Sequence, residues 1–223
     1  MKLFDRVLDL LFPPKCPFCN KIQDNRGICP ACEKDLPRVP EGEAVRTGPG
    51  GLRCAGAVWY EGTVRDAFLR LKFQGASELA EPLGELLARC AAEQLSGEFD
   101  TVTWVPVSRK RLRKRGYDQA ELLARAACRL WDTEPVRLLK KTADNPAQSG
   151  IRDAAARRAN VLGVYEAVGA VSGKRILLID DICTSGATLT ECIRVLEDAG
   201  AASVVCAAAA LRRQENVHKP AAE

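Results

Sequence analysis

Two adjacent carboxylates followed by a hydroxyl-rich turn are the residues of this sequence best suited to bind a ligand. Asp180 and Asp181 close an apolar run that is typical of a buried strand, and Thr184-Ser185-Gly186-Ala187-Thr188 then leads into a helical pattern. A turn before a helix N-terminus directs several backbone N–H groups at one point, which favours a bound phosphate. The pattern predicts a phosphorylated pentose, with its phosphate on residues 184–188 and its ribose hydroxyls on the two aspartates.

Four cysteines near the N-terminus have the spacing of a metal site. Cys16 and Cys19 form one C-x-x-C pair, and Cys29 and Cys32 form a second pair after a short polar segment. Two such pairs can supply four thiolates to one tetrahedral Zn²⁺, which leaves no open position for water. We therefore expect a structural zinc and a module that folds only around its metal. A disulfide framework or a redox pair is the alternative, although neither a secretory signal nor a βαβ context supports it.

Two further residues could carry chemistry but have a simpler interpretation. The hydroxyl-rich turn between the expected strand and helix is called the phosphate turn below. Cys183 lies inside it, where a helix N-terminus favours a thiolate. No base or third residue is identifiable beside it, so inert packing is the favoured interpretation. The single histidine, His218, lies in a charged C-terminal tail, and we expect it to be solvated rather than catalytic.

The composition is that of a soluble globular protein with one ordinary domain and a small module. The chain has 223 residues, of which 47% are hydrophobic, and a net charge of +4. That charge is too modest to indicate a general attraction to nucleic acid or lipid. Residues 1–12 alternate apolar and charged positions, so we expect a short amphipathic helix rather than a signal peptide or a membrane span. We expect no membrane insertion and a cytoplasmic protein.

The chain alternates strand and helix patterns after a Pro- and Gly-rich boundary near residues 37–51. We expect a zinc module with its linker in residues 1–50 and an α/β domain in residues 51–223. Expected strands cover residues 52–60, 101–107, 136–139, 161–168, 176–179 and 203–211. Expected helices cover residues 64–73, 77–95 and 152–160, and a helix that begins near Leu189 and closes at Gly200.

A basic segment follows the expected strand at residues 101–107. Residues 109–115 contain six cations in seven positions, and so many like charges need an anion nearby. We expect this segment to be a loop. Because loops at the carboxyl ends of adjacent strands converge on one crevice, it should face the Asp180–Thr188 turn. A solvated charged surface is the alternative for Lys110, Arg111 and Lys114.

The run from Leu177 to Thr188 resembles the phosphoribosyl pyrophosphate (PRPP) motif of type I phosphoribosyltransferases. Neither a P-loop nor a G-x-G-x-x-G fingerprint is present to offer another phosphate motif. In the family that it resembles, the two acidic residues hold the ribose hydroxyls and the Thr-Ser/Thr-Gly loop holds the 5′-phosphate. The resemblance implies a mostly parallel α/β sheet flanked by helices, and PRPP bound with Mg²⁺. Its pyrophosphate would fit the basic segment, on Ser108, Arg109, Arg113 and Arg115.

Three parts of the sequence together resemble the ComF family: the zinc module, the PRPP motif, and the segment between them. Val105-Pro106-Val107-Ser108 and Arg115-Gly116-Tyr117-Asp118-Gln119 match the Pro-rich strand end and the Arg-Gly-aromatic-Asn-Gln helix start of that family. Asp118 departs from the usual Asn, and helix N-capping is its simplest role. Thr142, Gln148, Arg158 and Asn160 also match the family, without an assignable chemical role.

Membership of that family would imply a role in natural competence, with single-stranded DNA and DNA-uptake proteins as partners. Two functions stay open at this point. In one, the phosphoribosyl site binds PRPP or a nucleotide and the chain handles internalised single-stranded DNA. In the other, the chain is an active Mg²⁺-dependent phosphoribosyltransferase that transfers ribose 5-phosphate to a nitrogen acceptor. The sequence identifies neither an acceptor pocket nor a catalytic base.

Overall fold

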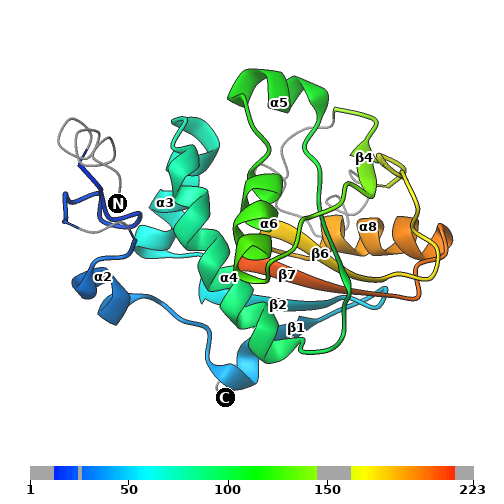
Figure 1. The fold of residues 1–223 in the computed structure, drawn as a ribbon, viewed down its shortest axis with the longest axis horizontal. Helices are drawn as coiled ribbons and strands as arrows, with labels where there is room; N and C mark the ends of the chain where they lie inside the picture. Colours follow the sequence, from blue (N-terminus) through cyan, green and yellow to red (C-terminus); the bar gives the residue numbers. More distant parts are fainter. Residues whose placement is uncertain (1–12, 25–26, 145–161, 214–223) are drawn as a thin grey trace, which may run out of the picture.

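A five-stranded sheet of order β1-β2-β7-β6-β3 forms the centre of the protein (Figure 1). The structure is a computed structural model that describes residues 13–24, 27–144 and 162–213. The short edge strand β1 is antiparallel to β2, and the other neighbours run parallel. The mostly parallel sheet confirms the predicted fold class. The strands are β1 (Val45–Thr47), β2 (Arg53–Trp59), β3 (Thr101–Trp104), β6 (Arg175–Cys183) and β7 (Ser203–Leu211).

Helices cover both faces of this sheet because successive strand residues point to opposite sides. Leu177 and Ile179 pack in one core with α3 (Gly62–Phe73), α4 (Ala80–Gln94) and α6 (Gln119–Leu130). Ile176 and Leu178 pack in a second core with α8 (Ala187–Asp198). The apolar run of β6 is therefore buried on both faces, as its sequence predicts. The smaller helices are α2 (Pro30–Asp35), η1 (Glu41–Glu43), η2 (Ser77–Leu79) and α5 (Arg109–Arg115).

Five of the expected strands have different bounds in the structure, although β2 differs from the expected residues 52–60 by only one residue at each end. β3 ends at Trp104 rather than at residue 107, and Pro106, which follows shortly, has no N–H for a sheet ladder. β4 (Leu139–Lys141) lies slightly later than expected, and β5 (Tyr165–Ala167) is shorter than the expected strand at residues 161–168. β6 continues to Cys183, so that both aspartates lie within the strand rather than after it. The helix expected from Leu189 begins earlier, at Ala187, and Gly200 follows its C-cap, Ala199, with a positive φ of 90°.

The basic segment forms helix α5, so the expectation of a loop was wrong. Arg and Lys are good helix formers, and cations in the last turn interact favourably with the helix dipole. Both ends are also capped. The Ser108 hydroxyl accepts a hydrogen bond from the backbone N–H of Arg111 (3.3 Å). Gly116 takes a left-handed conformation (φ 83°), and its N–H donates to the carbonyl of Leu112 (2.8 Å).

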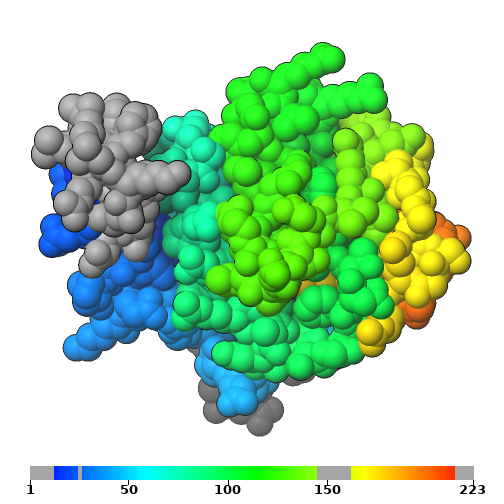
Figure 2. Space-filling model, in the orientation of Figure 1, coloured from blue at the N-terminus to red at the C-terminus, as the bar shows by residue number. Residues whose placement is uncertain are grey.

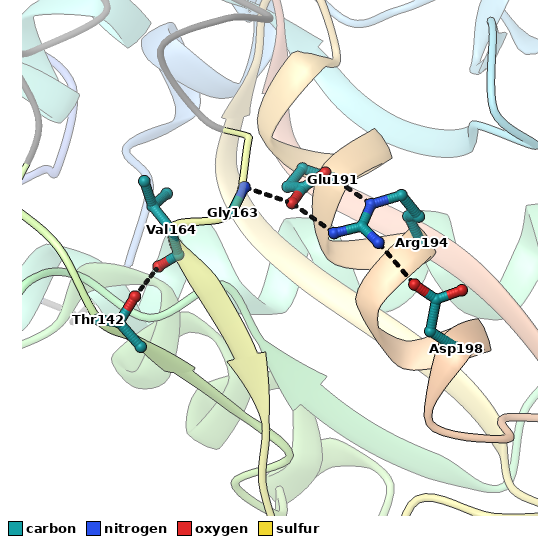
Figure 3. Close-up of polar contacts among 6 residues, drawn as sticks. All are labelled: Thr142, Gly163, Val164, Glu191, Arg194 and Asp198. Atoms are coloured by element: carbon teal, nitrogen blue, oxygen red, sulfur yellow. Dashed lines mark hydrogen bonds and ion pairs between the residues drawn. The ribbon is translucent and has the colours of Figure 1, made fainter.

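A small two-stranded sheet, β4–β5, is fixed to α8 beside the main sheet (Figure 3). Thr142 Oγ1 donates a hydrogen bond to the carbonyl of Val164 (3.2 Å) and so ties the end of β4 to the start of β5. The N–H of Gly163 donates to Glu191 Oε1 (2.9 Å), a buried carboxylate on α8 that Arg194 also binds. Because α8 begins at the phosphate turn, these contacts hold the small sheet in a fixed position relative to that turn.

Several sequence predictions lie outside the described residues. They include the N-terminal helix at residues 1–12, the helix at residues 152–160, His218, and the family positions Gln148, Arg158 and Asn160. Within the described residues, no helix is both long enough and apolar enough to span a membrane.

Candidate functional site

A cleft of about 610 Å³ lies at the carboxyl ends of β3 and β6. Its walls come from α3, from α5 and the start of α6, and from the small β4–β5 sheet. This is where an open α/β sheet places its ligand, because loops at the carboxyl ends of neighbouring strands leave a crevice between them. The predicted ribose residues Asp180 and Asp181 both line it, as do Thr184 and Thr188 of the predicted phosphate turn.

One of the two aspartates, Asp181, is held by a lysine that the sequence reasoning missed. Lys72, on the last turn of α3, places its Nζ 2.7 Å from Asp181 Oδ2, and both side chains are largely shielded from solvent. Asp180 Oδ1 accepts a hydrogen bond from the N–H of Asp181 (2.8 Å). Burial, together with the neighbouring Asp181 carboxylate, raises the pKa of Asp180 well above its usual value. The site therefore carries less negative charge than two free carboxylates would, which lowers its repulsion of phosphate.

The phosphate turn is braced from its outer side by another residue that the sequence reasoning missed. Arg46, on the edge strand β1, donates from Nη1 to the carbonyls of Cys183 (3.1 Å) and Thr184 (2.7 Å). Arg46 thus fixes the end of β6 and the start of the turn to the edge strand. Gly186 is the N-cap of α8 with φ 76°, and Ala187 is its first residue. Cys183 is buried and in contact with the Cys54 thiol, which supports the packing interpretation.

The basic helix divides into residues that reach the cleft and residues that do not. Arg115 lines the cleft, and so does Arg111, for which a solvated surface was the alternative. Of the other predicted pyrophosphate residues, Ser108 is buried as the N-cap of α5, and its Oγ also donates to Asp144. Arg109 and Arg113 are exposed and are not among the lining residues of the cleft. Figure 2 shows this green segment at the upper edge of the molecule.

Lys141 and Tyr165 of the small sheet also line the cleft, and no motif in the sequence predicted them. Lys141 Nζ lies 3.2 Å from Tyr165 Oη and 5.0 Å from the centre of the ring. Burial, and to a lesser extent the positive charge of Arg111, lowers the pKa of Lys141 to about 8. Strand pairing between β4 and β5 brings these residues to the site, and the short sequence of β4, one leucine and two lysines, does not predict that placement.

The pKa of Lys141 predicts how the affinity for an anionic ligand depends on pH. Lys141 is largely charged at pH 7 and neutral above pH 9, so the affinity of a ligand with a pyrophosphate group, such as PRPP, should fall across that range. We expect a fall of about tenfold, the weakening that follows from losing one charge-assisted contact of about 1.5 kcal/mol. Isothermal titration between pH 7 and 9 measures it. In Lys141→Arg, which stays charged, the fall should be absent, and an equal fall in that variant would contradict the assignment.

Asp118 caps α6 from within the protein. Its Oδ1 accepts from the N–H of Ala120 (3.1 Å), and its Oδ2 accepts from the N–H of Val107 (2.9 Å). The predicted N-cap role is therefore confirmed. Burial outweighs these hydrogen bonds and raises the pKa of Asp118 to about 6. The carboxylate fixes the β3–α5 connection to the start of α6, so it shapes one wall of the cleft without being exposed in it.

The raised pKa of Asp118 predicts a pH-dependent change in stability. Between about pH 4 and pH 6 the folded protein holds a proton that the unfolded chain releases, so this group lowers the free energy of unfolding as the pH rises. A shift of about two pKa units corresponds to about 2–3 kcal/mol. Denaturant unfolding of the wild type and of Asp118→Asn at pH 4 and pH 7 measures it. From pH 4 to pH 7 the free energy of unfolding should fall by about 2–3 kcal/mol more in the wild type than in Asp118→Asn. An equal change in the two proteins would contradict the raised pKa of Asp118.

The four predicted zinc ligands come together at the N-terminal end. The sulfur atoms of Cys16, Cys19, Cys29 and Cys32 all lie within 4.8 Å of one another. The 3.7 Å between Cys19 Sγ and Cys29 Sγ is close to the spacing of thiolates bound at about 2.3 Å to one tetrahedral Zn²⁺. The donor set thus fits a structural zinc. Arg70 of α3 donates to the carbonyls of Pro17 and Phe18, so the zinc module rests on the helix that carries Lys72.

Comparison with known proteins agrees with both parts of the structure. Residues 112–222 match the family described as "Phosphoribosyl transferase domain", and residues 7–44 match "Double zinc ribbon domain". The fold and the site thus define a phosphoribosyltransferase-type domain that follows a zinc-ribbon module.

Two similar proteins indicate more closely which family the chain belongs to. The DNA utilization protein YhgH of Escherichia coli (strain K12) is 28% identical over 205 residues, which covers 85% of this chain and 86% of that protein. The competence protein ComFC of Streptococcus pneumoniae (strain ATCC BAA-255 / R6) is 32% identical over 145 residues, covering 65% and 62%. The chain belongs to the ComF family. Among solved structures, a glutamine PRPP amidotransferase from B. subtilis aligns with a TM-score of 0.41 and 24% identity, over 60% of this chain and 26% of that one.

Proposed function

We propose that the chain binds PRPP or a nucleotide through the ribose 5-phosphate group and acts in the cytoplasm on internalised single-stranded DNA. The observation that carries the proposal is the charge of the cleft. Two acidic side chains lie at the end of β6, and six basic side chains surround them, so a polyanion with a sugar diol matches the cleft. The acidic residues are Asp180 and Asp181, and the basic ones are Arg65, Lys72, Arg111, Arg115, Lys141 and Arg212.

Hydrogen bonds from the turn would supply most of the affinity for the 5′-phosphate. The helix dipole contributes about 0.3–1 kcal/mol, whereas each hydrogen bond to a charged group contributes about 1.5–3 kcal/mol. The donors of this turn are the backbone N–H groups of residues 185–188 and the hydroxyls of Thr184, Ser185 and Thr188. The N–H of Ala187 lies 3.5 Å from Ser185 Oγ and would exchange that acceptor for the phosphate. Ribose hydroxyls would donate to Asp180 and Asp181, with Lys72 holding Asp181 in place. Arg111, Arg115 and Lys141 would receive the pyrophosphate of PRPP.

The residues fit a Mg²⁺ ion that enters together with PRPP. Magnesium usually binds one or two carboxylates together with substrate phosphates, rather than an all-protein cage. The cleft offers two carboxylates, and among the described residues the cysteine cluster is the sole group of three or more metal-ligating side chains. Bound Mg²⁺ would neutralise phosphate charge. Asp180 and Asp181 would hold it from the side of the ribose.

A pair of threonines on the same turn and helix tests phosphate binding. Thr184→Val removes a hydroxyl that lines the cleft, whereas Thr190→Val removes one that donates to Pro49 away from it. We expect Thr184→Val to weaken ribose 5-phosphate and PRPP by about tenfold or more, the equivalent of one charge-assisted hydrogen bond. Thr190→Val should bind as the wild type does. Isothermal titration that detects no binding of either compound to the wild type would refute the proposal.

The exposed part of α5 supports a role with single-stranded DNA. Arg109, Lys110, Arg113 and Lys114 project into solvent next to the cleft wall, where they can follow a phosphate backbone. The double variant Arg113→Ala/Lys114→Ala should reduce the slope of log affinity against log salt by about 1.4, since each single-strand phosphate contact contributes about 0.7. Arg125→Ala, an exposed cation on α6, is the matched control. An unchanged slope in the double variant would exclude α5 as the DNA contact.

Transfer of the phosphoribosyl group is the second candidate, because residues 112–222 match a phosphoribosyl transferase domain. The bond between the anomeric carbon and pyrophosphate would break, with pyrophosphate leaving with the electron pair. A nitrogen acceptor would form the new bond and release its proton to solvent. Arg111, Arg115 and Lys141 could stabilise the leaving pyrophosphate. Pyrophosphate release from PRPP with Mg²⁺ and a mixture of bases tests this, and saturable binding of PRPP without release would reject transfer while leaving the binding function intact.

A further inference from the structure

Three side chains in the cleft form a connected set, in which Arg115, a proposed pyrophosphate residue, links two side chains that the ribose, phosphate and metal do not account for. Phe73 ends α3, Arg115 ends α5, and Gln119 begins α6, and all three line the cleft. The guanidinium carbon of Arg115 lies 5.3 Å from the centre of the Phe73 ring. Arg115 Nη1 also donates a 2.7 Å hydrogen bond to Gln119 Oε1. The set therefore runs from one wall of the cleft to the other through Arg115.

Gln119 carries a hydrogen-bond donor that needs a partner. The side chain is 1% exposed, and within the part of the chain that the structure describes its Nε2 has no hydrogen-bond partner. Arg115 can only donate, so its contact requires an oxygen at Oε1 and fixes the orientation of the amide. The amide N–H₂ group is then left as a donor on a residue that lines the cleft. A buried donor of this kind is costly to leave unpaired, and a ligand with a hydrogen-bond acceptor would satisfy it.

The aromatic ring of Phe73 is exposed, whereas soluble proteins usually bury such rings. It is 69% exposed at the mouth of the cleft, whereas Val64, Ala67, Phe68 and Leu71 of the same helix are buried. The guanidinium group of Arg115 lies over the ring. Aromatic rings and guanidinium planes are the two protein surfaces on which unpaired bases stack. A planar, partly apolar ligand group is thus what this surface fits.

We propose that Phe73, Arg115 and Gln119 form a nucleobase subsite, in which the base stacks on Phe73 and Arg115 and accepts a hydrogen bond from Gln119 Nε2. The inference rests on the proposed function, because the ribose 5-phosphate site places the base. A second phosphate would use the charge of Arg115 but would leave the exposed ring without a partner. A base uses the ring, the guanidinium plane and the amide together. The bound group is accordingly a nucleotide, free or at the end of a strand, rather than a sugar phosphate alone.

The test compares ligands that share the ribose phosphate and differ in the base. Isothermal titration would measure ribose 5-phosphate, PRPP, uridine 5′-monophosphate and adenosine 5′-monophosphate against the wild type and two variants, Phe73→Leu and Gln119→Met. We expect each variant to weaken the two nucleotides by about tenfold, a typical effect of removing one stacking contact in Phe73→Leu and one buried hydrogen bond in Gln119→Met. Ribose 5-phosphate should change by less than about twofold. Phe73→Tyr should bind all four compounds as the wild type does, and Leu112→Ala, an exposed apolar residue of α5 that is not a lining residue, is the control for surface changes.

The outcomes separate the subsite from the proposed function. Loss of nucleotide affinity with unchanged ribose 5-phosphate affinity supports the subsite. Equal losses for ribose 5-phosphate and the nucleotides would mean that these side chains hold the sugar phosphate, which overturns the subsite and leaves the proposed function in place. Unchanged nucleotide binding in Phe73→Leu also overturns the subsite, and because Phe73 is exposed this variant should fold normally. Failure of the wild type to bind any of the four compounds would overturn the proposed function itself.

Discussion

Removing the metal from the cysteine cluster should unfold the N-terminal module and leave the α/β domain folded. Apart from the metal, the module is held by a few contacts to the α/β domain, chiefly the buried Phe18 and Leu36 and the hydrogen bonds from Arg70. Its helix α2 has six residues and buries none of them, which is far too short to be stable alone. Metal binding in comparable structural sites contributes about 10–16 kcal/mol, more than any other contact in the module can supply. The α/β domain has its own two cores on either side of the sheet.

The measurement combines metal content with hydrogen exchange. We expect one zinc per chain, since Cys16, Cys19, Cys29 and Cys32 are the only cysteines within the matched residues 7–44, although that family is described as a double zinc ribbon. A strong chelator, or Cys29→Ser, should abolish the protection of amides in the module and leave that of β6 and β7 unchanged. Cys90→Ser, a half-buried cysteine outside the cluster, should keep the zinc. Two zinc ions per chain, or full protection after chelation, would contradict the assignment.

Loss of the zinc should also affect the cleft, because α3 contacts both the module and the cleft. Arg70 binds the carbonyls of Pro17 and Phe18, and Lys72 on the same turn binds Asp181. When the module unfolds, Arg70 loses both acceptors and the last turn of α3 loses its support. The zinc-ribbon module and the cleft are therefore physically connected, although their residues are far apart in the sequence.

The features predicted from sequence are those specified by local pattern. The apolar run of β6, the turn after it and the two C-x-x-C pairs each lie within a short segment, so strand burial, helix start and metal spacing could all be derived from neighbouring residues. The capping role of Asp118 was accessible for the same reason. In these cases the residue type, the spacing and the chemistry point to one structure.

The residues that sequence reasoning missed are brought to the site by long-range packing. Arg46 reaches the phosphate turn because β1 adds to the edge of the sheet, and Lys141 reaches the cleft because β4 pairs with β5. Lys72 was partly predictable from the sequence, because it is a cation on the last turn of an expected helix and follows the buried Leu71. The basic segment forms a helix and not the expected loop, because the helix propensity of Arg and Lys and the caps at Ser108 and Gly116 outweigh the repulsion between its charges.

Replacing Gly186 by alanine should abolish phosphate binding and destabilise the protein by about 2–5 kcal/mol. Gly186 has φ 76°, which costs an L-residue about 1–2 kcal/mol. A Cβ atom there would also lie 2.3 Å from Leu52 Cδ2, a buried side chain with little room to move. Overpacking of this kind costs about 1–3 kcal/mol and is relieved by backbone shifts. The backbone that shifts is the turn itself, whose N–H groups are the proposed phosphate donors.

A second glycine serves as a control that separates the conformational cost of a positive φ from the cost of overlap with Leu52. Gly173 has nearly the same φ, 73°, and a Cβ there would meet nothing within 4 Å, so Gly173→Ala reports the conformational cost alone. Leu52→Ala combined with Gly186→Ala should recover the part due to overlap, which a double-mutant cycle of unfolding free energies measures. In titrations with ribose 5-phosphate, Gly186→Ala should lose at least about 100-fold in affinity, the equivalent of two charge-assisted hydrogen bonds, while Gly173→Ala loses none. A folded Gly186→Ala protein that binds ribose 5-phosphate normally would show that this turn does not hold the phosphate.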